Sequence, residues 1–345
     1  MAAQPKSRIR AAAKGLALLV VALVLAGIVY EQVGERRDRK RYPQIGRSVD
    51  IGGRTLNILC SGEGGPTVIF EGAGHTAGYA WIDIQGEVAK FTRACWYDRA
   101  GYGWSDPGPS PRTFKAIAND LHALLEAAGV PGPYVLVGAT AGAFHVRVFN
   151  GLYPKETAGA VLIHASDADV FAHEPEYMKG AMASLPPLVQ RIGCTVVGPA
   201  MLRLGLLRLM GNPGAGRPFG AANLTHDQQQ ELYFLSNNPG TAQTEGEGCV
   251  LEESMAEVRA AGDFGSRPLA VLTGAKPFRA PSPKYAKETE ALNEYWFHQL
   301  QPRLAALSTR GRLVIEDTAE GPGAVIRAIR DVAGEIRAER PQAER

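Results

Sequence analysis

The feature of this sequence that most constrains its fold is a strand that leads directly through a glycine-flanked turn into a helix. Residues 133–154 read PYVLVGATAGAFHVRVFNGLYP, with Gly138 and Gly142 on either side of Thr140. A turn this tight has no room for side chains against the neighbouring strand and helix, so glycine is needed at both flanking positions. We therefore expect a buried strand, a sharp turn that presents Thr140, and a helix that packs on the sheet.

Strand-like and helix-like stretches alternate from residue 46 onward. A hairpin turn at 50–54 precedes the strand-like run TLNILC, and further runs read PTVIFEG, FTRACWYD, AGAVLIHA, RPLAVLTG and GRLVIED. Between them, apolar residues keep helical spacing, as at Ile117, Leu121 and Leu124. This alternation predicts the α/β class, with a mostly parallel twisted sheet covered by helices on both faces.

One interval breaks the alternation. Residues 169–262 are rich in Leu, Met, Pro and Gly, and we interpret them as an inserted helical cap over the carboxyl edge of the sheet. The predicted organisation is an N-terminal anchor and stalk over 1–45, a first part of the core over 46–168, the cap, and a second part of the core over 263–345. The most apolar stretch of the cap, MLRLGLLRLM, either fills its interior, the commoner arrangement, or faces lipid.

The N-terminal segment is uncharged and apolar over Gly15–Tyr30. A helix of that length rises about 24 Å, and Ala11–Ala13 extend the run to roughly the thickness of a hydrocarbon core, with Lys14 able to reach the headgroups. Basic residues precede the run and no Ala-x-Ala site follows it, which favours an uncleaved signal anchor over a cleaved signal peptide. A buried core helix would not need so uniform an apolar surface.

Charge and cysteine content limit the partners. The formal net charge of +2 gives no reason to expect nucleic acid. Lys and Arg flank the apolar run almost equally on both sides, so its orientation stays open. The stretch ERRDRKRYP is interpreted as a solvated stalk that ends at Pro43.

The 4 cysteines show no C-x-x-C spacing, so we expect neither a metal nor a cofactor. We predict a single-pass membrane protein whose folded domain is exported.

Several stretches together resemble the α/β-hydrolase superfamily, and within it a group of membrane-anchored bacterial-type hydrolases. The resemblance extends over about residues 42–336. PYVLVGATAGAFHVRVFNGLYP resembles the turn that carries the family's nucleophile, with Gly138 and Gly142 as its glycines, and YDRAGYGWSDPG resembles the loop after the fourth strand. FEGAGHTAG resembles the loop that supplies one oxyanion-hole N–H. The resemblance implies backbone donors at Ala73 and Ala141.

The strand order of this family also implies a pairing of cysteines. The strand that ends at Cys60 would lie beside the strand that carries Cys95, at a separation that suits a disulfide. Cys194 and Cys249 both fall in the predicted cap and are candidates for a second bridge. Both bridges require an oxidising compartment, which agrees with an exported domain.

The departures from the family pattern are as informative as the match. The family uses a serine, an acid and a histidine in that chain order. Here Thr140 stands at the nucleophile position, His164 at one acid position, Lys276 at the more usual acid position, and Glu320 about where the histidine belongs; no histidine follows His298. We therefore predict a pseudoenzyme that binds an apolar, lipid-like ligand or a protein partner. The alternative is an esterase-like hydrolase in which Thr140 attacks and His164 serves a rearranged triad, although His164 is more simply a strand-end histidine.

Overall fold

The computed structural model describes residues 5–179, 185–210, 224–238, 240–241, 250–318 and 321–343. Its centre is an 8-stranded sheet with the order β1-β2-β4-β3-β5-β6-β7-β8, in which β1, β2 and β4 pair antiparallel and the remaining neighbours pair parallel. Every strand that the sequence pattern predicts is present. The strands are β1 (Arg47–Asp50), β2 (Thr55–Ser61), β3 (Thr67–Glu71), β4 (Ala94–Tyr97), β5 (Tyr134–Ala139), β6 (Thr157–Ile163), β7 (Leu269–Thr273) and β8 (Gly311–Ile315).

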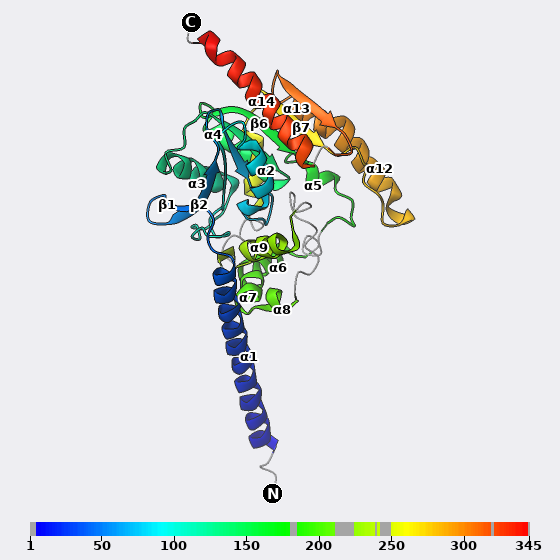
Figure 1. The fold of residues 1–345 in the computed structure, drawn as a ribbon. Helices are drawn as coiled ribbons and strands as arrows, with labels where there is room; N and C mark the ends of the chain where they lie inside the picture. Colours follow the sequence, from blue (N-terminus) through cyan, green and yellow to red (C-terminus); the bar gives the residue numbers. More distant parts are fainter. Residues whose placement is uncertain are drawn as a thin grey trace.

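Helices cover both faces of this sheet, as the alternating pattern predicts (Figure 1). Side chains alternate between the faces of a strand, so β5 buries Leu136 in one core and Val135 in the other. Leu124 and Phe149 come from helices of the first face, and Val332 comes from a helix of the second. The first face carries α3 (Phe114–Ala127), α4 (Ala141–Leu152) and α11 (Leu251–Ala260), and the second carries α2 (Ile82–Val88) and α14 (Pro322–Ala343).

The N-terminal helix α1 (Pro5–Arg41) extends away from the body as one long rod (Figure 1). It is long and apolar enough to cross a membrane, and side chains such as Leu18 and Leu23 are exposed along it. The basic stretch expected as a stalk is part of the same helix up to Arg41, with an ion pair one turn apart between Arg39 and Glu35. The apolar segment and the folded body are therefore joined by continuous helix.

The predicted cysteine pairing is confirmed for the first pair. Cys60 on β2 and Cys95 on β4 are directly opposite in the antiparallel ladder and form a disulfide. Cys194 is disulfide-bonded as well, whereas Cys249, its predicted partner, lies outside the described residues.

The segment between β6 and β7 consists of helices and loops in its described part. Its helices α6 to α9 lie on the side of the sheet from which α1 extends (Figure 1). Within MLRLGLLRLM, Leu202 is buried, but Leu209 and Met210 are 71% and 57% exposed. The interpretation of this stretch as interior is therefore wrong for α8, whose outward side chains have no core to enter. The helices are α5 (Val170–His173), α6 (Pro187–Ile192), η3 (Gly193–Val197), α7 (Gly198–Arg203), α8 (Leu206–Met210) and α9 (His226–Ser236).

Candidate functional site

Thr140 and His164 stand side by side at the carboxyl edge of the sheet. Each directly follows one of two adjacent parallel strands, β5 and β6, whose last residues Ala139 and Ile163 are partners in the ladder. Both residues have positive φ, 50° for Thr140 and 47° for His164. A β-branched residue tolerates this backbone conformation poorly, so the turn at Thr140 stores conformational strain of about 1–3 kcal/mol. Carboxyl edges of parallel strands are where such sheets bind ligands.

The two glycines that flank Thr140 permit close backbone contacts. A Cβ atom on Gly138 would lie 2.5 Å from the carbonyl oxygen of Gly142, and a Cβ atom on Gly142 would lie 2.7 Å from the carbonyl oxygen of Gly72. The first contact closes the turn on itself. The second brings the start of α4 against the loop that follows β3, so any larger residue at Gly142 would separate the two.

A buried polar cluster lies beneath this turn. The carboxylate of Glu71, at the end of β3, accepts hydrogen bonds from Arg99 at 3.0 Å, from Tyr97, and shares one with His145 Nδ1 at 3.0 Å. Glu71, Arg99 and His145 are each at most 3% exposed at the side chain. Burial alone would raise the pKa of Glu71, but the hydrogen bond from His145 and the charges of His145 and Arg99 lower it overall. Glu71 is therefore an ionised anchor.

Arg99 extends the cluster into the loop after β3. Its guanidinium donates to the carbonyl oxygen of Gly72 at 2.7 Å and also to that of Gly74. These bonds fix the peptide group that precedes Ala73 and the one that follows Gly74. Among the described residues, no group accepts a hydrogen bond from the N–H of Ala73 or of Ala141, the first residue of α4. Both N–H groups are thus available as donors.

A cavity of about 360 Å³ opens above the turn. Thr140, Ala141 and His164 line it, whereas Ala73 does not. Most of the remaining wall is apolar. The other lining residues are Phe144, Ser166, Val170, Phe171, Glu174, Met178, Phe278, Leu292 and Trp296.

Among the described residues that line the wall, one carries a carboxyl group. Glu174 lies just after α5 and is half-buried, and burial raises its pKa although the charge of Lys179 lowers it. Apart from this side chain, the cavity offers an apolar surface with a few polar atoms at the turn, an arrangement typical of sites for small apolar ligands.

Among the described residues, no base is hydrogen-bonded to Thr140. Across the described residues, its hydroxyl makes no hydrogen bond to His164 or to any other side chain. The His164 ring packs against Trp296, with 4.8 Å between ring centroids. Lys276 and His298 are exposed, and Glu320 lies outside the described residues. In this geometry the imidazole lies in the same cavity as Thr140 but does not activate its hydroxyl.

Sequence reasoning missed several residues of the site. Ser166 and Glu174 come from the stretch after β6, and Phe278 and Trp296 come from the region after β7, none of which carries a motif. Their position after the carboxyl ends of adjacent strands is the signal that could have indicated them. No group of three or more His, Cys, Asp or Glu side chains that could hold a metal ion occurs in the part of the chain that the structure describes.

Comparisons of sequence find partial relatives. Residues 59–192 match the family model described as alpha/beta hydrolase fold. An uncharacterized vacuolar membrane protein of Saccharomyces cerevisiae is 39% identical over 89 residues, which cover 25% of this chain but only 14% of that protein. The uncharacterized protein YqjL of Bacillus subtilis is 32% identical over 123 residues, covering 34% of this chain and 47% of YqjL. Helix α1 is long and apolar enough to cross a membrane, and the matched Saccharomyces cerevisiae protein is described as a vacuolar membrane protein.

Solved structures cover most of the chain. The haloalkane dehalogenase loop variant DbeA-M1 from Bradyrhizobium elkanii superposes with a TM-score of 0.59 at 18% identity, covering 86% of this chain and 98% of that one. The enol-lactonase from Burkholderia xenovorans LB400 gives a TM-score of 0.54 at 16% identity, over 83% and 99% of the two chains. At these identities the likeness concerns the fold. Together with the family match, it shows that the chain has the α/β-hydrolase fold.

Proposed function

We propose that this protein is a membrane-anchored member of the superfamily that binds an apolar, lipid-like ligand in the Thr140 cavity and does not hydrolyse esters. The observation that carries the proposal is that the Thr140 hydroxyl has no hydrogen-bonded base in the described structure, while the cavity around it is largely apolar. A hydrolase of this type needs a base within about 2.6–3.2 Å of the attacking hydroxyl. A binding site needs only the cavity and the backbone donors.

The helical segment contributes to this cavity, which supports its role as a cap. Phe171, Glu174 and Met178 come from the stretch that follows β6 and line the cavity wall. We propose that residues 169–262 form the cap, between core parts 46–168 and 263–345. The cap would then close the cavity from water and leave the N–H of Ala141 to hold the polar end of the ligand.

A thermal-shift experiment with long-chain amphiphiles tests the binding proposal. A ligand that binds only the folded state stabilises it by about 2.7 kcal/mol at a hundredfold excess over its Kd. Ala141→Trp should abolish this stabilisation because the bulky ring fills the cavity. Leu152→Trp, at the exposed end of the same helix, is the matched control and should keep it. The proposal would be refuted if the ligand stabilised both variants equally. It would also be refuted if the ligand stabilised neither the unmodified protein nor the control.

Glu174 sharpens the choice of ligand. An ionised Glu174 repels a carboxylate in the same cavity, so a long-chain alcohol should bind better than the matching fatty acid at neutral pH. Glu174→Gln should improve fatty-acid binding several-fold and leave alcohol binding unchanged. An equal effect on both ligands would show that Glu174 shapes the cavity and does not select charge.

A second function has one specific observation in its favour. Thr140 and His164 line the same cavity, so an imidazole and the hydroxyl share one space. An esterase-like hydrolase with a rearranged triad is therefore the rival proposal. Steady turnover of an activated ester that disappears in Thr140→Ala would favour it and exclude the pseudoenzyme.

We further propose that the folded domain is exported. The Cys60–Cys95 disulfide and the bonded state of Cys194 support an oxidising compartment. Labelling of thiols in the unreduced, denatured protein isolated from cells should find none free. Four reactive thiols would place the domain in a reducing compartment instead.

A further inference from the structure

The helices α6, η3 and α8 expose a run of large aliphatic side chains. Single exposed aliphatic residues are ordinary on a soluble protein, but a contiguous group marks an interaction site. The segment 185–210 that carries them contains Arg191, Arg203 and Arg208 and no acidic residue. We call this group the α6–α8 apolar surface. It comprises Leu188, Val189, Ile192, Val196, Val197, Leu206, Leu209 and Met210.

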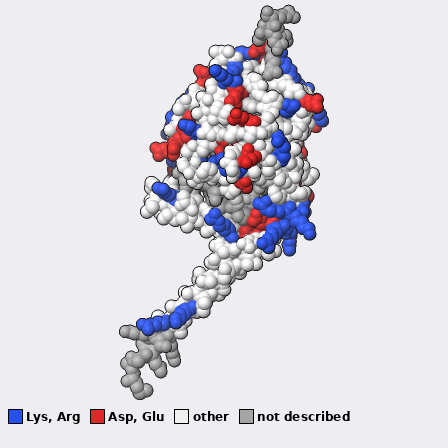
Figure 2. Space-filling model, turned by 90° about the vertical axis from the view of Figure 1, so that its left-hand side faces the viewer, with Lys and Arg blue, Asp and Glu red and all other residues white. Residues whose placement is uncertain are grey.

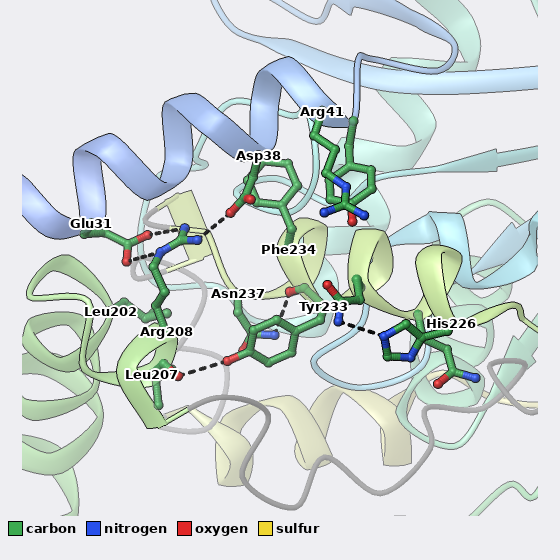
Figure 3. Close-up of a pocket in the computed structure, with 13 residues that line it drawn as sticks. Glu31, Asp38, Arg41, Leu202, Leu207, Arg208, His226, Tyr233, Phe234 and Asn237 are labelled. Carbon is green, nitrogen blue, oxygen red and sulfur yellow. Dashed lines mark hydrogen bonds and ion pairs between the residues drawn. The ribbon is translucent and has the colours of Figure 1, made fainter.

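The turn between α7 and α8 is fixed against α1. Gly27 of α1 is so close to this turn that a Cβ atom there would lie 2.8 Å from the carbonyl oxygen of Leu204. One helical turn further along α1, Glu31 is buried and forms an ion pair with Arg208 at 2.9 Å. Arg208 also pairs with Asp38 at 2.5 Å, so its guanidinium bridges two turns of α1 (Figure 3).

These contacts set the depth of the turn relative to the membrane. The apolar run of α1 ends at Tyr30, and at about 1.5 Å per residue Gly27 lies roughly 4.5 Å inside that end. The basic residues at 36–41 begin about 9 Å beyond Tyr30 by the same measure, and Lys and Arg gather where α1 meets the body (Figure 2). The boundary between acyl chains and headgroups therefore lies at the level of the α7–α8 turn.

We propose that the α6–α8 apolar surface inserts into the headgroup region and outer acyl chains of the same bilayer that α1 crosses. The aliphatic side chains of α8 lie at the depth where an interfacial helix buries its apolar face. Arg191 and Arg203 of the same segment are exposed, and the absence of acidic residues from this segment suits a surface that contains anionic lipid. The protein thus contacts the membrane at two places. This inference depends on membrane insertion of α1 and not on the ligand proposal.

Trp fluorescence in vesicles tests the insertion. The full-length protein with Leu209→Trp is reconstituted in vesicles of phosphatidylcholine and phosphatidylglycerol with brominated acyl chains, which quench nearby indoles. Leu209 is 71% exposed, so the larger ring does not enter a core, and an unchanged unfolding temperature checks this. We expect the added emission of the variant to lose at least half its intensity relative to vesicles without bromine.

Ile315→Trp is the matched control, because Ile315 is an exposed aliphatic residue on β8. Its added emission should be quenched by aqueous iodide and not by brominated lipid. If the Leu209→Trp emission is quenched by iodide and not by lipid, the surface faces water and the proposal is overturned. If it is protected from both quenchers, another protein covers the surface, and the proposal is equally overturned.

Discussion

The turn at Thr140 separates two regions that are built in opposite ways. Beneath it, Glu71, Arg99 and His145 are buried, and the Glu71 carboxylate has a partner in each of the other two. Above it, the Thr140 hydroxyl faces an apolar cavity without a hydrogen-bonded partner in the described structure. The carboxylate that holds the turn in place is thus paired, while the hydroxyl that would make the turn reactive is not.

This difference separates the requirements of shape from those of chemistry. The cluster beneath the turn fixes the loop around Ala73, and the glycines fix the approach of α4. Both are needed by any protein that uses the cavity, whether it binds or reacts. A base at the hydroxyl is needed only for reaction. A molecule that keeps the first set without the second is suited to binding.

The largest expected effect on stability comes from disrupting the buried cluster around Glu71 beneath the turn. Glu71→Ala leaves Arg99 and His145 buried without their shared carboxylate, which costs about 3–5 kcal/mol of unfolding free energy. Denaturant unfolding in detergent measures it. Glu156→Ala is the matched control, because Glu156 pairs with His122 at a site where both side chains are about one-third exposed, and such a pair contributes at most about 1 kcal/mol. Equal losses in the two variants would contradict the comparison.

The pH dependence of this effect has a defined sign. The folded pKa of Glu71 is lowered from 4.5, so its contribution is fully present above that pH and is lost as the pH falls through the lower folded value. Glu71→Gln should therefore be about 2 kcal/mol less stable than the unmodified protein at neutral pH, and the difference should shrink in acid.

Asp98 is a control because its effect on stability should change with pH in the opposite direction. Burial raises the pKa of the Asp98 carboxyl, although hydrogen bonds from Asn57, Trp104 and Gly78 lower it. Its ionised form therefore costs stability above the unfolded pKa, and this cost disappears as the pH falls through the raised value. The stability of the unmodified protein relative to Asp98→Asn should increase in acid. A parallel trend for Glu71→Gln and Asp98→Asn would contradict one of the two assignments, and the direction of the trend would show which one.

A smaller effect concerns the strain at the turn. Thr140 has a φ of 50°, which glycine adopts freely. Relief of about 1–3 kcal/mol of strain outweighs the entropy that glycine adds to the unfolded chain, so Thr140→Gly should be more stable by about 1 kcal/mol, or about 2–4 °C in Tm. Thr309→Gly, at an exposed position without positive φ, should be destabilised instead. Loss of stability in both variants would show that the turn is not strained.

Sequence patterns predicted the fold because the signals were local. The strand-like runs appear as β1 to β8, and the glycines at 138 and 142 make the close contacts that the tight turn requires. The Cys60–Cys95 disulfide followed from the strand order of the family. Continuation of α1 through the basic stretch was missed because polar residues there carry no apolar periodicity, although their ion pairs support a helix.

The site was less predictable because it joins distant segments. Glu71 contacts His145, which lies 74 positions away in the sequence, and no motif predicts that contact. Phe278 and Trp296 line the cavity from a region in which apolar residues have no distinctive pattern. The positive φ of His164 depends on its place after β6, since the sequence around it contains no glycine that would indicate a tight turn. Tertiary packing decides all of these features.

The smallest expected effect is the most decisive for function. Thr140→Ser removes the methyl group from the turn and keeps the hydroxyl. It therefore places the family's serine at the nucleophile position without adding a base. A positioned base contributes about 10²–10⁴-fold to such a reaction. Turnover of an activated ester by Thr140→Ser should therefore stay within about twofold of Thr140→Ala, and a serine-reactive phosphonate should not label it. Strong turnover would show that a base is already in place, and its loss in a Thr140→Ser, His164→Phe double variant would identify that base as His164.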